Sequence, residues 1–353
     1  MRIATLSSGF DIGETEIDQL RTSLRGPLLL PDDRGYNEAR TIFNGMFDPR
    51  PAIITRCRGM ADVVHVVQFA APHSLLTAIR ARGHSVAGNS TCDGGLVIDL
   101  SEMNGVVVDR ARQTVRVQCG ATWRDVDRET QVLGLATPGG IVSHTGAGLA
   151  LNGGIGWLRN KYGLTCDNLV SAELVTAAGE VVTANASENA DLLWALKGGG
   201  GNFGVVTSFE FALHPVGPLV AVVFSIYPIS STRSVLRKWR DWLAFAPDDA
   251  STEILTWTAP AGSSLPALVH EPEIVIAAGS IRRRCRGFAV PAVESGYRRL
   301  TPWSRCRRRS RTIAPISGHA NAGRQDRWCG YKRGYSSRNA TTGSTVAARR
   351  EGT

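Results

Sequence analysis

The sequence predicts an α+β fold with more than one domain, on three observations. Short strand-like runs and short amphipathic helices are interspersed along the chain. The glycine motif with dinucleotide-binding spacing lies between a helix and a strand, which is the wrong order for a Rossmann domain. The pattern also changes after residues 214–218, where a second αβ domain begins. A chain of 353 residues has room for two domains.

The first domain follows a mixed N-terminal segment, residues 1–45. In that segment residues 14–24 have helical spacing, with Ile17, Leu20 and Leu24 on one face. Between residues 46 and 218, Thr122 is expected to cap a helix that extends through Val132. The other expected helices cover residues 61–70 and 189–197, and the strands cover residues 51–55, 75–79, 94–100, 106–109, 114–119, 169–176, 181–184 and 205–213.

The second domain is expected over residues 219–280. Residues 219–226 read as a strand, and residues 231–244 as an amphipathic helix that carries Trp239 and Trp242. Further strands are expected near residues 253–259 and 273–278. We interpret residues 219–280 as the beginning of a second αβ domain.

The charge of the chain is divided unevenly. Residues 281–353 hold 18 Lys and Arg against 3 Asp and Glu, whereas residues 1–280 hold 22 and 28. The globular part is therefore mildly acidic, and the basic tail suggests either a disordered arm for nucleic acid or a reading-frame error in a GC-rich gene. We favour the second interpretation, and do not expect nucleic acid to be a partner. A DNA read with an intact frame beyond codon 280 would contradict it.

The seven cysteines and the hydropathy exclude several other classes. No cysteine pair has zinc-ligand spacing, so we expect free thiols and no metal site. The N-terminus lacks the pattern of a secretory signal, and no apolar run is long enough to span a membrane. These observations predict a cytoplasmic protein that does not use a membrane.

Two small-residue segments are candidates for ligand binding. The loop Arg80–Gly88 has His84 at its centre and joins two strand-like runs, and close approach of its N–H groups suits an anion. An ordinary hairpin with a surface histidine is the alternative. The second segment, residues 137–156, is too rich in glycine for an ordinary connection. It contains His144, for which the sequence offers no partner, so we expect a simple loop histidine.

Several motifs in order resemble the FAD-linked oxidases of the vanillyl-alcohol oxidase superfamily, in particular the bacterial berberine-bridge-enzyme-like group. The motifs are Arg82–Gly88, Gly95–Ser101, Gly120–Trp123, Thr145–Leu149, Asn152–Leu158, Tyr162–Asn168 and Gly198–Phe211. The resemblance implies a PCMH-type FAD-binding domain of two small α+β lobes over residues 46–218. It also implies the beginning of an antiparallel-sheet substrate domain over residues 219–280.

The resemblance assigns cofactor contacts residue by residue. His84 would bond covalently to the 8α-methyl group of FAD, beside a loop that cradles the diphosphate. Asn168 would lie beside the glycine-rich wall, and the backbone of Val205 or Val206 would meet the adenine. The implied diphosphate and ring contacts are Ala81, Arg82, Gly83 and Ser85, with Thr145, Gly146, Gly148, Asn152, Gly153 and Gly156 from the second segment.

The implied activity is oxidation of an alcohol, sugar or natural product by hydride transfer to FAD, with O2 as electron acceptor. No catalytic acid or base can be assigned, because the family places it beyond residue 280. The alternatives are a truncated, inactive relative that at most binds FAD, and a nucleic-acid-binding protein that acts through the tail. Arg82 departs from the small residue usual in the family, and its charge or its Cβ is expected to affect the loop.

Overall fold

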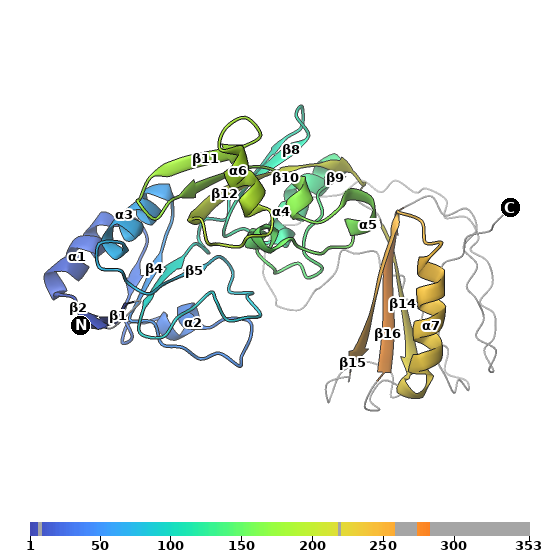
Figure 1. Ribbon diagram of the computed structural model, residues 1–353, viewed down its shortest axis with the longest axis horizontal. Coiled ribbons are helices and arrows are strands. Elements are labelled where there is room, and N and C mark those ends of the chain that lie inside the picture. Colours follow the sequence, from blue (N-terminus) through green and yellow to red (C-terminus); the bar gives the residue numbers. More distant parts are fainter. Residues whose placement is uncertain (6–8, 218–219, 258–273, 283–353) are drawn as a thin grey trace, which may run out of the picture. The chain divides into compact units, whose positions relative to one another are not determined.

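The computed structural model describes residues 1–5, 9–217, 220–257 and 274–282 (Figure 1). The chain divides into two compact units, Met1–Pro218 and Leu219–Thr353, and each is considered by itself. The expected basic tail, residues 281–353, lies outside the described residues except for its first two positions.

One lobe of the first unit is built on a four-stranded sheet. Its order is β3 (Leu28–Leu29), β4 (Ile53–Arg56), β6 (Leu96–Asp99) and β5 (Thr77–Arg80), with β4, β6 and β5 parallel. Every residue of β6 is buried. The continuous apolar character of Leu96–Ile98 follows from this position, because a central parallel strand is covered on both faces.

The other lobe is a five-stranded antiparallel sheet. Its order is β11 (Val181–Asn185), β10 (Leu169–Val175), β12 (Val205–Ala212), β8 (Thr114–Gln118) and β7 (Val106–Asp109). The alternating residues of β8 place Val115 and Val117 in the core and Arg116 outside. The expected hairpin around Gly179 is confirmed as the β10–β11 turn.

Helices cover these sheets and close one continuous core. The elements α1 (Glu14–Ser23) and α3 (Met60–Ala70) pack together, and α3 contacts both β6 and β10, so it links the two lobes. The helix α4 (Trp123–Thr130) packs on β7 and β8, and α6 (Ala190–Leu196) packs on β11. The short helix α2 (Tyr36–Arg40) covers the other face of β4.

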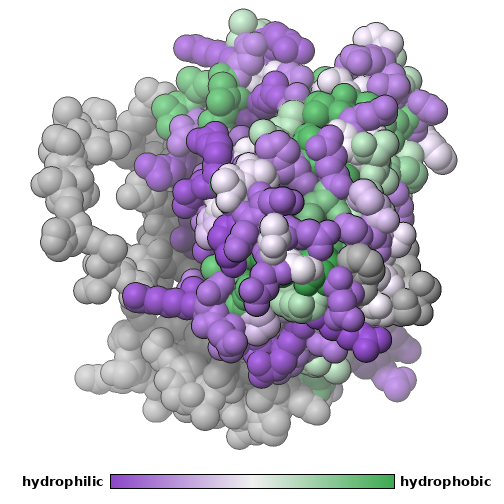
Figure 2. All heavy atoms as spheres, turned by 90° about the vertical axis from the view of Figure 1, so that its left-hand side faces the viewer, coloured by the Kyte–Doolittle hydropathy of each residue, from purple (hydrophilic) through white to green (hydrophobic). Residues whose placement is uncertain are grey.

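The outer surface at the α1 end of this unit is mostly hydrophilic, with apolar side chains in small separate patches (Figure 2). The helix α1 buries only Ile17 and Leu20, as its spacing predicted. No described helix is long and apolar enough to cross a bilayer.

The connection around His84 is not the hairpin of the alternative interpretation. Strands β5 and β6 are parallel neighbours, with Thr77 opposite Leu96 and Arg80 opposite Asp99. Parallel strands need a connection that returns along the whole strand, so residues 81–95 form a long crossover. The hairpin alternative is therefore wrong, and the crossover leaves the His84 loop at one edge of the sheet.

The second unit contains a three-stranded antiparallel sheet and one helix. The sheet order is β14 (Val220–Pro228), β16 (Ile274–Arg282) and β15 (Ala250–Trp257). The helix α7 (Thr232–Leu243) is joined to β15 by a hydrogen bond from Trp239 Nε1 to Thr252 Oγ1 of 2.9 Å. These elements confirm the expected antiparallel α+β pattern.

Small elements complete the first unit, and sequence periodicity did not predict them. They are β1 (Arg2–Ala4) paired with β2 (Gly9–Asp11), β9 (Leu135–Ala136) paired with β13 (His214–Pro215), the helix α5 (Arg159–Tyr162) and the 3₁₀ turns η2 (Ala147–Asn152) and η3 (Cys166–Asn168). Each is too short to give a periodic signal.

Candidate functional site

The loop that follows β5 presents a row of free backbone donors. Among residues 1–5, 9–217, 220–257 and 274–282, none accepts a hydrogen bond from the backbone N–H groups of residues 82 to 85. Gly83 takes a left-handed conformation, with φ of +65°, so the chain turns sharply here. Consecutive free N–H groups in such a turn form a concave anion site.

His84 is held between two other rings. Its imidazole stacks on the ring of Phe43, with centroids 4.0 Å apart and planes at 13°. Its Nε2 lies 3.1 Å from Nε2 of His144, so one of these nitrogens donates a hydrogen bond to the other. Phe43 is also tied to the loop, because its N–H donates to the carbonyl oxygen of Gly83.

The environment of His84 disfavours its charged form. Burial lowers the pKa of His84 most, the neighbouring His144 lowers it further, and the backbone of His84 itself raises it. The ring is therefore held toward its neutral form, which has one free lone pair. His144 is exposed, and it has the partner that the sequence did not reveal.

The side chain of Arg82 contacts the segment that leads into α4. Its Nε donates to the carbonyl oxygen of Gly120 at 2.6 Å, and its Nη2 lies 3.8 Å from Asp125 Oδ2 at the start of α4. Its backbone does not take a positive φ. The Arg82 Cβ therefore does not force the backbone of this residue into a strained conformation. The side chain lies along the neighbouring loop and supports it.

The second glycine segment lies directly against this loop. The N–H of Trp123 donates to Thr145, and the N–H of Ala147 donates to Ala121, so Thr145–Ala147 is paired like a short strand. A Cβ added to Gly146 would lie 3.2 Å from the Cβ of Arg82. A side chain at Gly146 would therefore be tight, and Arg82 would have to move by a few tenths of an ångström. Gly148 is close to Ala81, since an added Cβ would be 3.8 Å from the Ala81 Cβ.

Further along, Asn152 is the last residue of the 3₁₀ turn η2, and Gly153 and Gly156 follow this turn. Gly153 has φ of +90°, and its carbonyl oxygen accepts from the N–H of Cys166. A Cβ on Gly156 would lie 1.9 Å from the carbonyl oxygen of Gly139, so the close backbone contact requires glycine. The side chain of Asn152 is exposed and lies near Gly200.

Asn168 is buried, and its side chain is fully used inside the protein. Its Nδ2 donates to the carbonyl oxygens of Tyr162 and Leu164, both at 2.8 Å. Its Oδ1 lies 2.6 Å from Nε2 of His214, whose ring stacks on Tyr162. Asn168 therefore fixes the turn beside Gly153 and has no polar atom left for a ligand.

Val205 and Val206 are the first two residues of β12, at positions that the neighbouring strand β8 does not reach. Both pair with β10, opposite Val175 and Leu174, whereas pairing with β8 extends only from Ser208 onwards. Both side chains are buried. Their backbone thus pairs with one strand only, near the end of the Gly198–Gly204 loop.

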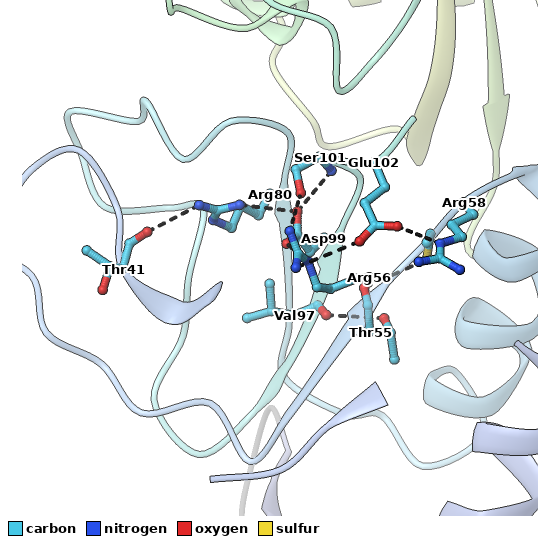
Figure 3. A network of polar contacts seen from close by, with 10 residues as sticks. Thr41, Thr55, Arg56, Arg58, Arg80, Val97, Asp99, Ser101 and Glu102 are labelled. Carbon is cyan, nitrogen blue, oxygen red and sulfur yellow. Dashed lines mark hydrogen bonds and ion pairs between the residues drawn. The ribbon is translucent and has the colours of Figure 1, made fainter. Parts of the chain in front are cut away.

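A buried ion-pair network anchors the start of the histidine loop (Figure 3). The side chain of Asp99 is fully buried, and its Oδ1 accepts hydrogen bonds from Arg80 Nη1 at 3.2 Å and from the N–H of Ser101. Arg56 Nε lies 3.4 Å from the other carboxylate oxygen. Arg80 also donates to the carbonyl oxygen of Thr41, so this network ties the segment before Phe43 to the end of β5.

Several buried hydroxyl groups near these loops lack partners within the described part of the chain. They belong to Ser90 and Thr91, which follow the histidine loop, and to Thr137, which begins the glycine-rich segment. A buried polar atom without a partner costs stability, so such atoms often mark a ligand site. In the described ranges, no group of three or more His, Cys, Asp and Glu could hold a metal ion.

The fold therefore brings most of the candidate residues together. Ala81–Ser85 contacts Thr145–Gly148, while Asn152, Gly153, Gly156 and Asn168 line up along the same segment. The sequence missed His144, Phe43 and the Arg80–Asp99 pair as partners of this loop. The position of His144 within the glycine-rich segment was the available signal for it, whereas Phe43 had none.

Comparisons with known proteins agree with this geometry. Residues 51–185 match the family described as FAD binding domain. The FAD-linked oxidoreductase pgmH of Aspergillus terreus is 41% identical over 60% of this chain and 44% of its own length. The (R)-6-hydroxynicotine oxidase of Paenarthrobacter nicotinovorans is 40% identical over 54% of this chain and 42% of its own.

Solved structures give the same result. The 6-hydroxy-D-nicotine oxidase of Arthrobacter nicotinovorans superposes with a TM-score of 0.67 at 33% identity, over 74% of this chain and 56% of that one. The xylooligosaccharide oxidase of Myceliophthora thermophila C1 gives 0.65 at 26% identity, over 76% and 56%. The chain spans about half the length of the relatives it matches.

Proposed function

Because this chain belongs to the FAD-linked oxidoreductases of the vanillyl-alcohol oxidase superfamily, we propose that it oxidises a small molecule by hydride transfer to covalently held FAD. The observation that carries this proposal is the position of His84. Its ring is clamped by Phe43 and His144 at the end of a loop with four free N–H groups.

The residues of the first unit fit FAD. Two phosphates need convergent hydrogen-bond donors, and the N–H groups of residues 82–85 supply them without a competing acceptor among the described residues. Gly146 and Gly148 remove side chains from the facing wall. The unpartnered hydroxyls of Ser90, Thr91 and Thr137 would regain hydrogen bonds from a polar cofactor.

The remaining contacts have distinct proposed roles. Thr145, Asn152, Gly153 and Gly156 line the wall along the diphosphate and ring, and Val205 or Val206 meets the adenine through the backbone. Asn168 acts indirectly, since its hydrogen bonds to Tyr162 and Leu164 hold the turn behind this wall.

FAD when bound supplies the hydride acceptor, and the protein supplies its position and environment. His84 and the loop fix one end of the cofactor, and the Arg80–Asp99 ion pair holds that loop against the sheet. The substrate proposed is an alcohol, a sugar or a natural product, with O2 as electron acceptor. Oxidases that act on a nicotine derivative and on an oligosaccharide are among the similar proteins.

Acid precipitation tests the covalent part of this proposal. We expect full-length protein expressed with riboflavin to give a yellow pellet and a fluorescent band on a denaturing gel. His84→Ala should lose both signals, whereas His65→Gln, a substitution on the distant helix α3, should keep them. A colourless wild-type pellet would contradict covalent attachment.

A peroxide assay tests the activity. Purified protein is incubated with oligosaccharides, aromatic alcohols and hydroxylated N-heterocycles, and H2O2 is followed with a peroxidase dye. We expect one class to give sustained turnover. A protein that holds flavin but reduces none of it with any class under anaerobic conditions would instead be a flavin-binding relative without this activity.

A further inference from the structure

His214 lies close to the end of the first unit at Pro218. Its Nε2 lies 2.6 Å from Oδ1 of Asn168, and its ring stacks on Tyr162 with centroids 4.0 Å apart and planes at 9°. His214 is half-buried, and Asn168 is buried. The sequence did not mark this histidine as a site residue, and the contacts proposed for FAD do not include it.

The neighbours of Asn168 decide which atom donates in this contact. Its Nδ2 donates to the carbonyl oxygens of Tyr162 and Leu164, so both amide hydrogens are used. Its Oδ1 can only accept, and the proton of the 2.6 Å contact therefore belongs to Nε2 of His214. With the amide turned over, Oδ1 would face two carbonyl oxygens. The orientation of the Asn168 amide and the tautomer of His214 thus fix each other.

The turn that Asn168 holds is bonded to two glycines of the glycine-rich segment. The N–H of Thr165 donates to the carbonyl oxygen of Gly154 at 3.0 Å, and the N–H of Cys166 donates to that of Gly153 at 2.8 Å. Gly153 has φ of +90° and Gly154 has φ of +85°. Two free glycines would sample many conformations, and a ligand that requires one of them would lose affinity through that ordering. The turn over residues 162–168 therefore keeps this pair preorganised.

The backbone beside His214 holds the other end of the same segment. Strand β13 pairs with β9, with His214 opposite Ala136, which directly precedes residues 137–156. The N–H groups of residues 216 and 217 both donate to the carbonyl oxygen of Gly134. Residues 214–217 therefore hold the start of the glycine-rich segment through their backbone, and its end through the His214 side chain and Asn168.

We propose that His214 is a positioning residue for FAD, because its Nε2–H fixes Asn168 and thereby keeps Gly153 and Gly154 in the conformation needed at the wall along the cofactor. This inference rests on the FAD binding in the proposed function, but not on covalent attachment. The effect of His214 passes through Asn168 and the turn 162–168, so the histidine takes no part in the hydride transfer.

The affinity for FAD tests this role in the full chain carrying His84→Ala, where binding stays reversible. Quenching of flavin fluorescence is measured well below the unfolding temperature of each variant, so that only folded protein is compared. His214→Phe keeps a ring on Tyr162 but removes the donor, and we expect it to weaken FAD binding roughly tenfold. His214→Gln keeps an N–H donor and should bind FAD within about threefold of the chain with His214.

Two further variants control for other effects of the substitution. His65→Phe makes the same exchange at an exposed histidine on α3 and should leave the affinity for FAD unchanged. Asn168→Ala should weaken FAD binding at least as much as His214→Phe. The double variant should bind about as weakly as Asn168→Ala alone, because both changes remove one hydrogen bond. Fully additive losses would overturn the inference, since His214 would then act by another route.

The tautomer of His214 gives a readout that needs no FAD. The flavin-free full chain is labelled with 15N-histidine, and long-range 1H–15N correlation at pH 8 should place the His214 proton on Nε2. A proton on Nδ1, or an unchanged affinity for FAD in His214→Phe, would overturn this inference and leave the proposed function intact. A wild type that binds no FAD would instead overturn the proposed function, and this inference with it.

Discussion

Asp99 lies outside the proposed site but supports it through buried ion pairs. It is fully buried, faces Arg80 and Arg56, and accepts a hydrogen bond from the N–H of Ser101 (Figure 3). Arg80 is the first residue of the His84 loop, and it donates to the carbonyl oxygen of Thr41, two residues before Phe43. The carboxylate therefore holds the start of the His84 loop and the segment that carries Phe43.

Replacing Asp99 with Asn should destabilise the first unit and weaken flavin attachment. The substitution leaves two guanidinium groups without their buried counter-charge, and breaking such a pair costs about 3 kcal/mol. Chemical denaturation measures the loss. Asp18→Asn is the control, because Asp18 pairs with Arg21 on the exposed face of α1, and a pair of that kind contributes about 0.5 kcal/mol. Equal losses in both variants would contradict the role given to Asp99.

Asp127 on α4 gives a pH-dependent prediction. Burial raises its pKa to about 6, and no described residue forms a side-chain hydrogen bond or ion pair with it. A raised folded pKa means that the folded state binds the proton more tightly. Its contribution to stability is therefore largest at low pH and is lost as the pH rises through about 6.

Asp127→Asn should consequently stabilise the protein at pH 7.5 and have little effect at pH 4.5. The residue keeps partial exposure, so the expected gain at pH 7.5 is about 1 kcal/mol. Thermal unfolding of both proteins at both pH values measures the difference. Glu129→Gln, an exposed neighbour on the same helix, should change stability little at either pH. An equal effect of Asp127→Asn at both pH values would contradict the assignment.

At the scale of elements, the glycine-rich segment works through close backbone contacts. Gly156 meets the backbone of Gly139, and Gly146 meets Arg82, so the segment folds onto itself and onto the His84 loop. By contrast, Gly201 has open space around its Cα, although it lies in an equally glycine-rich stretch. The two segments are both rich in glycine, but a close backbone contact requires glycine at Gly156 and not at Gly201.

Gly156→Ala should cost about 2 kcal/mol of stability and reduce flavin binding, because its Cβ would overlap the Gly139 carbonyl and displace the wall. Gly201→Ala should change stability by less than about 0.5 kcal/mol. Urea denaturation and flavin fluorescence quenching measure the two effects. Comparable behaviour of both variants would show that the Gly139 contact is not needed.

At the scale of the whole molecule, the first unit has its own core. The large cluster of buried residues extends from Ile3 to Leu213, entirely before Pro218. It joins both sheets through α3, which contacts β6 and β10. The residues proposed to hold FAD all lie within the same unit.

A protein of residues 1–218 should therefore fold by itself and bind FAD. Domains with a separate core commonly fold in isolation. We expect cooperative unfolding in urea and quenching of flavin fluorescence on titration with FAD. His84→Ala in the same fragment controls for attachment, since it should fold equally well. An aggregated or non-cooperative fragment would show that the second unit is needed for folding.

Local patterns allowed most elements to be predicted. The helical spacing of residues 14–24 and 61–70, the Thr122 cap and the alternation of residues 114–119 reappear as α1, α3, α4 and β8. A helix is indicated by apolar residues three or four positions apart, and a strand by apolar residues two positions apart. Such short spacings can be read from the sequence itself. The family motifs likewise located the FAD-binding unit and its two glycine segments.

Contacts between distant residues were decided only by the tertiary structure. Parallel pairing of β5 and β6 makes their connection a crossover and excludes the hairpin alternative, because strand direction depends on which strands become neighbours. Residues 121–123 pair with residues 145–147, and Arg82 donates to the adjacent Gly120, so the loops at residues 84 and 144 lie together. The sequence placed His84 at the centre of the loop that is proposed to hold the cofactor. Packing decided that Phe43 and His144 would hold its ring, because such contacts form only when separate lobes close on one core.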